Sequence, residues 1–180
     1  MKDFFDISTP RLLVHPLEKK ALFDFVFLRN KFINESNLDV PDNIIDPELL
    51  ASLTDVIFPQ VNKNKNILFY TLWLIILKEK NQAAGIFCMK GEPDEQGEIE
   101  IGYSIGQQFR NKGLMTEALR AIVYWFDNFP EITTVKAETL SDNYSSIRVL
   151  EKVGFRLRQR KGDYLLWKLM DLGDKQKKSI

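Results

Sequence analysis

Hydrophobic residues follow strand and helix periods along most of the chain, and turn-forming residues separate the periodic stretches. The pattern predicts strands at Pro10–Pro16, Leu68–Lys78, Ala83–Lys90, Glu98–Ile105, Ile132–Glu138, Phe155–Arg160 and Tyr164–Met170. The second to fourth of these follow one another through short polar turns and predict an antiparallel meander. The last two flank a turn at Lys161–Asp163, which predicts a closing hairpin.

Helical spacing of apolar residues predicts a helix at Leu17–Leu28 and another at Tyr144–Val153, where Gly154 is the expected C-terminal cap. The one-sided apolar face of a third helix, which Pro130 ends, consists of Leu114, Ala118, Ile122, Trp125 and Phe129. No internal repeat or second core is evident, so we expect one domain over residues 1–180.

Two segments lack a clear period. Asn30–Asn66 is rich in Asn, Asp and Pro, and it predicts irregular structure with one helical stretch near Pro47–Ile57. We expect this variable region to face the acceptor substrate. Asp171–Ile180 is polar and basic, which predicts a flexible tail.

Composition narrows the function classes. Twenty-five basic residues balance 25 acidic ones, so the formal net charge is zero, and no nucleic-acid partner is expected. One cysteine and one histidine exclude an internal disulfide and the usual clustered zinc sites, so no metal is expected. The acidic N-terminus and the shortness of the most apolar run, Leu68–Leu77, predict a cytoplasmic protein with no membrane partner.

A candidate anion site lies between a predicted strand and a predicted helix, at Arg110–Met115. A helix start exposes backbone N–H groups, and Gly113 lets a ligand approach the backbone closely. Arg110 and Lys112 add positive charge, and Thr116 can supply a hydroxyl group. On spacing alone, an ordinary strand-to-helix turn is the alternative.

Four segments in order, Thr9–Val14, Glu100–Ile105, Arg110–Ala118 and Asn143–Phe155, resemble the GNAT superfamily of N-acetyltransferases. Within it they are similar to the branch that includes the ribosomal-protein N-terminal alanine acetyltransferases. The resemblance implies an α/β (α+β) fold with a mixed, mostly antiparallel central sheet, flanked by helices, whose central strands splay apart. It implies acetyl-CoA as cosubstrate.

The resemblance also implies roles for individual residues. The backbone of the phosphate loop, formed by Arg110, Asn111, Lys112, Gly113, Leu114, Met115 and Thr116, would hold the pyrophosphate. Tyr103, Ser104 and Ile105 would be main-chain partners of the pantetheine arm, with Asn143 and Ser146 beside it. Lys152, and less directly Arg148 and Arg156, would approach the adenosine phosphates. Asn143 has a competing role as a helix N-cap, and the cations a competing role in solubility.

Three positions depart from the family pattern. Asn111 and Met115 stand where many members have glycine or alanine, which narrows the loop. Leu150 stands where some relatives have a tyrosine that protonates the departing thiolate. Ser146 and Tyr144 are the substitutes that the sequence offers for this acid.

An alkyl amine has an unperturbed pKa of ~10.4 and must lose a proton before it attacks a thioester. Glu98 and Glu100 share one face of their predicted strand, and a carboxylate there can accept that proton. We favour Glu100, where the family pattern has an acid, and keep Glu98 as second candidate. Two nearby carboxylates would raise the pKa of one of them. A half-solvated strand explains the same alternation without catalysis.

The leading hypothesis is an N-acetyltransferase that moves acetyl to a primary amine, on a small molecule or at a protein N-terminus. The alternative is a catalytically silent CoA-binding sensor or interaction module. The oligomeric expectation is a monomer or homodimer. His15 and Cys88 are expected to be packing residues rather than catalytic groups.

Overall fold

The computed structural model describes residues 5–44, 57–63 and 66–170. Its sheet has eight strands in the order β1-β2-β3-β4-β5-β6-β8-β7. They are β1 (Ile7–Ser8), β2 (Leu12–Pro16), β3 (Leu72–Leu77), β4 (Gln82–Met89), β5 (Glu98–Ile105), β6 (Thr134–Leu140), β7 (Arg156–Lys161) and β8 (Tyr164–Met170). All neighbours are antiparallel except β5 and β6, which are parallel. This is the mixed, mostly antiparallel sheet that the family resemblance implies.

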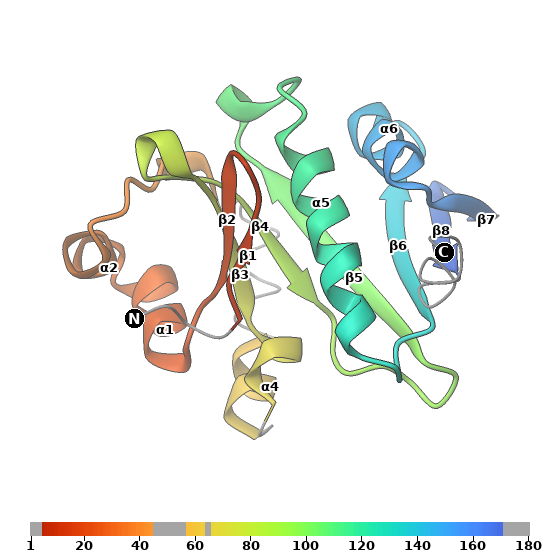
Figure 1. The fold of residues 1–180 in the computed structure, drawn as a ribbon, viewed down its shortest axis with the longest axis horizontal. Helices are drawn as coiled ribbons and strands as arrows, with labels where there is room; N and C mark the ends of the chain where they lie inside the picture. The colour runs from red at the N-terminus through yellow and green to blue at the C-terminus, as the bar shows by residue number, and fades with distance from the viewer. Residues whose placement is uncertain (1–4, 45–56, 64–65, 171–180) are drawn as a thin grey trace, which may run out of the picture.

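Helices cover both faces of the sheet (Figure 1). They are α1 (Lys19–Phe27), α2 (Arg29–Ser36), α4 (Phe58–Lys63), α5 (Leu114–Trp125) and α6 (Tyr144–Val153), and the short 3-10 turns are η1 (Asp42–Ile44), η3 (Ile67–Tyr70), η4 (Lys78–Lys80), η5 (Gln107–Phe109) and η6 (Phe126–Asn128). Alternate residues of β3 divide between two cores: Trp73 and Ile75 pack on the side of α5 and α6, while Leu74 packs with α1 and α2.

Parallel pairing of β5 and β6 is confined to the first half of β5. The register runs from Glu98 opposite Thr134 to Ile101 opposite Ala137, and no β6 residue pairs with Gly102–Ile105. The two strands therefore separate at their C-terminal ends, as the splayed arrangement requires. Because α5 and α6 both begin at that end of the sheet, the opening lies between two helix starts (Figure 1).

The predicted elements at Glu98–Ile105, Tyr144–Val153 and Tyr164–Met170 are confirmed with their bounds, and Gly154 caps α6 in the left-handed region with φ 109°. The predicted start of a strand at Leu68 is wrong, because β3 begins at Leu72. Leu68 and Phe69 are buried in η3, and the Leu68 carbonyl oxygen accepts a hydrogen bond of 3.0 Å from the Trp73 indole. Apolar composition alone does not distinguish a buried 3-10 turn from a strand.

Further differences concern segments with weak patterns. Helix α2 forms where we predicted irregular structure. Its sequence is polar and buries one residue, Phe32, so it lacks the apolar period that predicts a helix. Strand β6 begins at Thr134 rather than Ile132, which stays buried in the preceding turn. The helix predicted near Pro47–Ile57, apart from Ile57, and the tail predicted at Asp171–Ile180 lie outside the described residues.

Candidate functional site

The backbone of β5 is open towards the splay. The Gly106 N–H group donates to the Ala84 carbonyl oxygen at 2.9 Å, and Lys90 N–H donates to Glu100 at 2.8 Å. Hydrogen-bonded residues alternate along an antiparallel pair, so in the register of β4 with β5 the main chain of Ser104 pairs with β4. The N–H and C=O groups of Tyr103 and Ile105 therefore point away from β4, into the opening. Of the three predicted main-chain partners, Ser104 is the one whose backbone groups are engaged by β4.

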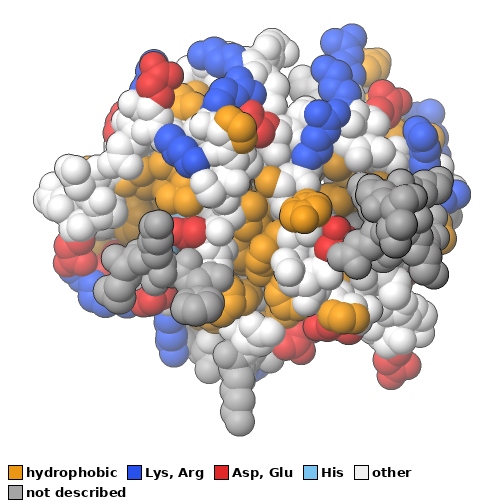
Figure 2. Space-filling view, viewed as in Figure 1, with side chains coloured by type: hydrophobic (Ala, Val, Ile, Leu, Met, Phe, Trp, Pro, Cys, Tyr) orange, Lys and Arg blue, Asp and Glu red, His pale blue; other side chains and the backbone are white. Residues whose placement is uncertain are grey.

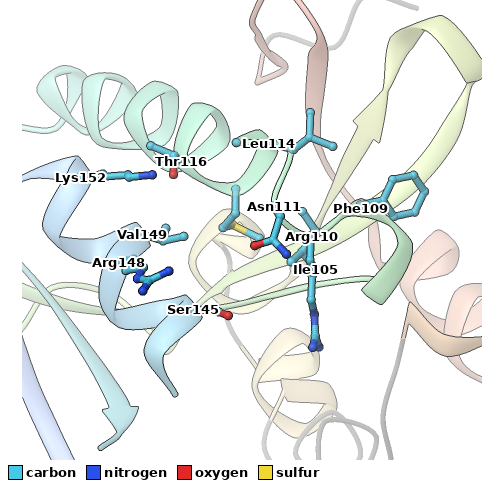
Figure 3. Close-up of a pocket in the computed structure, with 12 residues that line it drawn as sticks. Ile105, Phe109, Arg110, Asn111, Leu114, Thr116, Ser145, Arg148, Val149 and Lys152 are labelled. Carbon is cyan, nitrogen blue, oxygen red and sulfur yellow. The ribbon is translucent and has the colours of Figure 1, made fainter. Parts of the chain in front are cut away.

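Two adjoining cavities occupy this end of the molecule. The splay cavity, of about 440 Å³, is lined by Tyr103, Ser104, Ile105, Arg110, Met115, Leu140, Asp142, Asn143, Ser145, Ser146 and Val149. The phosphate-loop cavity, of about 200 Å³, is lined by Ile105, Phe109, Arg110, Asn111, Gly113, Leu114, Met115, Thr116, Ser145, Arg148, Val149 and Lys152 (Figure 3). Their linings share five residues, so the cavity at the start of α5 directly adjoins the one at the splayed strands: Ile105, Arg110, Met115, Ser145 and Val149.

The start of α5 has the geometry of an anion site. Gly113 is the N-cap residue, with φ 73°, and no side chain caps the helix. The first amides of α5 therefore have no intrahelical acceptor, and the helix dipole adds partial positive charge there. Asn111 also takes a left-handed conformation, with φ 60°. Asn is among the few residues that tolerate this region, which explains how it replaces glycine.

A second contact network holds the phosphate loop. The Arg11 guanidinium donates hydrogen bonds of 2.6 Å to Glu117 Oε2 and of 3.0 Å to the Lys112 carbonyl oxygen. The Thr9 hydroxyl donates a hydrogen bond of 2.6 Å to Glu117 Oε1. Burial alone would raise the pKa of Glu117, but the hydrogen bonds from Thr9 and Arg11 lower it below its usual value. Thr9 and Arg11 thus tie the loop to the first turn of α5, a role that the sequence did not reveal.

Cations reach the phosphate-loop cavity mainly from α6. Arg148 and Lys152 project towards α5 on the side of Thr116, whereas Arg110 extends to the other side (Figure 3). Lys and Arg side chains gather along the upper edge of the space-filling view, where α5 begins (Figure 2). Lys112 does not line either cavity: its Nζ lies 5.9 Å from the centre of the Phe109 ring. The backbone of Lys112 belongs to the loop, and a charge contribution from its side chain to the anion site stays a prediction.

The splay cavity holds a tyrosine–serine pair. The Tyr103 hydroxyl lies 2.6 Å from Ser146 Oγ, and burial raises the pKa of Tyr103 to about 12. Asn143 caps α6, because its Oδ1 accepts a hydrogen bond of 3.1 Å from Ser146 N–H. Asn143 also lines the cavity, so the cap and a place beside the ligand are compatible. Sequence reasoning gave Tyr103 a main-chain role and missed its side chain.

The two candidate bases have different surroundings. Glu98 pairs with Lys168 and, at 3.1 Å, with Lys136, and the hydrogen bonds from these lysines lower the pKa of Glu98. The expected rise in pKa from a neighbouring carboxylate is therefore wrong for Glu98. Among the residues that the structure describes, Glu100 pairs with one cation, Lys90. Both carboxylates lie on the face of β5 opposite Ile99 and Ile101.

Three other residues that the sequence analysis singled out lie outside the two cavities. Leu150 is fully buried in the core and reaches neither cavity. Burial raises the pKa of the Cys88 thiol to about 11, which keeps it protonated at neutral pH. His15 Nδ1 lies 2.7 Å from Asp6 Oδ1.

Two kinds of feature are absent from the described residues. They contain no cluster of three or more His, Cys, Asp or Glu side chains suited to a metal ion. No helix among them has the length and apolarity to cross a membrane.

Known proteins share this sequence pattern and this fold. Residues 11–156 match the acetyltransferase (GNAT) domain. The uncharacterized N-acetyltransferase YjdG of Bacillus subtilis is 31% identical over 105 residues, which are 58% of this chain and 62% of YjdG. The ribosomal protein uS5-alanine N-acetyltransferase of Escherichia coli is 38% identical over 66 residues, 37% of this chain and 34% of that protein. The alignments thus span less than two thirds of the length of these curated relatives.

Among solved structures, RimL, the ribosomal L7/L12 alpha-N-protein acetyltransferase in complex with coenzyme A, has a TM-score of 0.64 at 18% identity. The match covers 94% of this chain and 99% of that chain. At this identity the likeness concerns the fold, including the mixed sheet between two layers of helices.

Proposed function

The chain belongs to the GNAT acetyltransferase family, and we propose that it transfers an acetyl group from acetyl-CoA to a primary amine, on a small molecule or at a protein N-terminus. The observation that carries the proposal is that the phosphate-loop cavity and the splay cavity adjoin and share lining residues. Acetyl-CoA has a pyrophosphate at the middle of a long arm and a thioester at its end. The start of α5 suits the pyrophosphate, and the open edge of β5 beside it suits the arm that ends in the thioester.

The phosphate loop fits a pyrophosphate. Gly113 has φ 73°, a backbone conformation that L side chains rarely adopt, and without a side chain it leaves the backbone of the helix start accessible to a ligand. In the proposed complex the amides of Leu114, Met115 and Thr116 donate to the pyrophosphate. Arg148 and Lys152 supply positive charge to the adenosine phosphates from the opposite wall.

The open main chain of β5 suits the pantetheine arm. Tyr103 and Ile105 present N–H and C=O groups to the splay, and an extended amide-containing arm can pair with them as a strand would. The same Ile105 N–H is the proposed donor to the oxyanion that forms when an amine attacks the thioester.

We assign the general base to Glu100. It removes a proton from the ammonium form of the acceptor, directly or through water, so that the neutral nitrogen attacks the thioester carbon. Glu98 remains the second candidate, but its two lysine partners lower its pKa and make it the weaker base. As the C–N bond forms the C–S bond breaks, the attached nitrogen releases its second proton to solvent, and the hydroxyls of Tyr103 and Ser146 donate hydrogen bonds to the departing CoA thiolate. Since the pKa of Tyr103 is about 12, its proton stays in place for this task.

Thermal unfolding with and without acetyl-CoA tests the binding half of the proposal. At a ligand concentration ~100 times the dissociation constant, stabilisation of ~2.7 kcal/mol is expected, which at this chain length corresponds to a rise in Tm of roughly 5 to 10 °C. An unchanged Tm at millimolar acetyl-CoA would overturn the proposal.

Release of CoA thiol with a panel of small amines and N-terminal peptides tests the chemical half. Glu100→Gln should lower kcat about 100-fold or more while the Kd of acetyl-CoA stays within about twofold. Glu79→Gln, in the turn between β3 and β4, is the matched control and should behave as wild type. Binding of acetyl-CoA without turnover on any acceptor would instead favour a CoA-binding sensor.

A further inference from the structure

The last strand in the sheet order carries an uncompensated positive charge. Every residue of β7 is exposed, and four of its six side chains are basic: Arg156, Arg158, Arg160 and Lys161. We refer to these four residues as the basic edge. β7 contains no acidic residue, although the whole chain has a formal net charge of zero. β7 therefore carries a local excess of four positive charges.

None of these four cations forms an ion pair with a residue that the structure describes. Arg158 contacts the Met170 sulfur at 3.0 Å, and Arg160 donates to the Gly162 carbonyl oxygen at 3.3 Å. Lys168, on the neighbouring strand, is by contrast paired with Glu98. The basic edge is thus available to an external anion, whereas the charge of Lys168 on the neighbouring strand is balanced by Glu98.

The outer side of β7 has no strand partner in the described part of the chain. An edge strand presents unpaired N–H and C=O groups to which an extended polypeptide can add. Blue side chains mark this edge at the right of the space-filling view, where Figure 1 draws β7 (Figure 2). Pairing between two copies of β7 would bring like charges together, which disfavours a second copy of this chain as the occupant.

The basic edge begins beside the splay cavity. Leu140 lines that cavity and pairs with Tyr164, which in turn pairs with Lys161. Ser141 N–H donates to the Asp163 carbonyl oxygen at 2.7 Å and holds the β7–β8 turn against the end of β6. From Lys161 the strand leads away from the cavity for about 20 Å, the length of six extended residues.

We propose that the basic edge binds an extended acidic segment of a protein acceptor whose amine enters the splay cavity. This inference rests on the proposed function and narrows its acceptor to polypeptides with acidic residues. A polypeptide is favoured over a nucleic acid because the edge offers backbone pairing along a strand, and because the net charge of the chain is zero.

Equilibrium binding tests the proposal without requiring turnover. The probes are decapeptides with an N-terminal Ala and a C-terminal fluorophore, in which alternate positions are Glu, Gln or Lys. Fluorescence anisotropy should show the Glu peptide binding about tenfold more tightly than the Gln peptide at low salt, with the difference lost near 0.5 M salt.

Charge reversal at the basic edge provides the matched variants. Arg158→Glu combined with Arg160→Glu leaves two positive and two negative side chains at the four positions, and it should abolish the preference for the Glu peptide. A merely structural role of these residues would not remove that preference in a folded variant. Lys63→Glu combined with Lys80→Glu makes the same change in net charge on α4 and in the β3–β4 turn, and should leave the preference intact. An unchanged acetyl-CoA-induced rise in Tm shows that the reversed variant is folded.

Kinetics then connect the basic edge to acetylation. In wild type kcat/KM should be highest for the Glu peptide, and the reversal should change KM with little change in kcat. Equal kcat/KM for all three peptides would overturn the inference and leave the proposed function standing. Tighter binding of a single-stranded oligonucleotide of equal charge would also overturn it. Peptide binding without any acetyl-CoA binding would overturn the acceptor role together with the proposed function.

Discussion

The phenolic oxygen of Tyr103 lies 2.6 Å from Ser146 Oγ, and this contact joins β5 to the first turn of α6 across the splayed end of the sheet. Both residues line the splay cavity. Leu150, which stands where some relatives have a tyrosine, is buried in the core and has no hydroxyl group. The hydroxyl groups at this position of the cavity come instead from Tyr103 on β5 and Ser146 at the start of α6. A thiolate formed in the cavity would therefore meet donors from two elements.

The substitution Tyr103→Phe removes one donor and leaves the ring that packs against the core. We expect kcat to fall about 10- to 100-fold with the Kd of acetyl-CoA nearly unchanged. Because the pKa of Tyr103 is about 12, the wild-type rate should show no loss from this group as the pH rises to about 10. Steady-state kinetics across pH provide the measurement, with Tyr124→Phe on the exposed face of α5 as control. Equal kcat in Tyr103→Phe and wild type would remove the tyrosine from the mechanism.

The substitution Arg11→Ala should weaken acetyl-CoA binding although Arg11 lines neither cavity. It removes the hydrogen bonds to Glu117 and to the Lys112 carbonyl oxygen that hold the phosphate loop. We expect the Kd measured by calorimetry to rise about tenfold, since charge-assisted hydrogen bonds contribute about 1.5 to 3 kcal/mol. Arg11→Lys keeps the charge but cannot span both acceptors, so partial recovery is expected. Wild-type affinity in Arg11→Ala would show that the loop holds its shape without this contact.

The cations on α6 and in the loop should differ in their effects on cosubstrate affinity. Arg148→Ala combined with Lys152→Ala should raise the Kd of acetyl-CoA about tenfold and reduce its salt dependence, because both residues line the phosphate-loop cavity. Lys112→Ala is the matched control, since its ammonium group lies over Phe109. A larger loss of affinity in Lys112→Ala than in the double variant would contradict the structure.

The carboxylate of Glu98 should act on stability more than on catalysis. Its hydrogen bonds with Lys168 and Lys136 lower its folded-state pKa below the unfolded value of 4.5. The pairing therefore stabilises the protein above that pH, and the contribution is lost as the pH falls through the lower folded-state pKa. Glu98→Gln should reduce Tm by about 2 °C at pH 7, and by progressively less as the pH falls below 4.5. Calorimetric scans over a series of pH values check this, and a difference that grows with acidity would refute it.

Several elements of the site follow from local sequence. The bounds of β5 and α6 were predicted because their polar and apolar residues keep one period from end to end. The helix start at Gly113 and the cap at Gly154 follow from backbone conformations that glycine adopts without strain. The weakly patterned α2 was missed, because tertiary packing of Phe32 outweighs a polar composition there.

Local periodicity and backbone preference therefore account for most of the strands and helices of this chain and for the helix start at Gly113. The identity of the charged and polar partners depends on contacts between residues far apart in sequence, such as Arg11 with Glu117 and Tyr103 with Ser146. The separation of β5 from β6 likewise depends on where their pairing stops. Neither strand's own sequence determines that point, because strand pairing is a property of two chain segments brought together by folding.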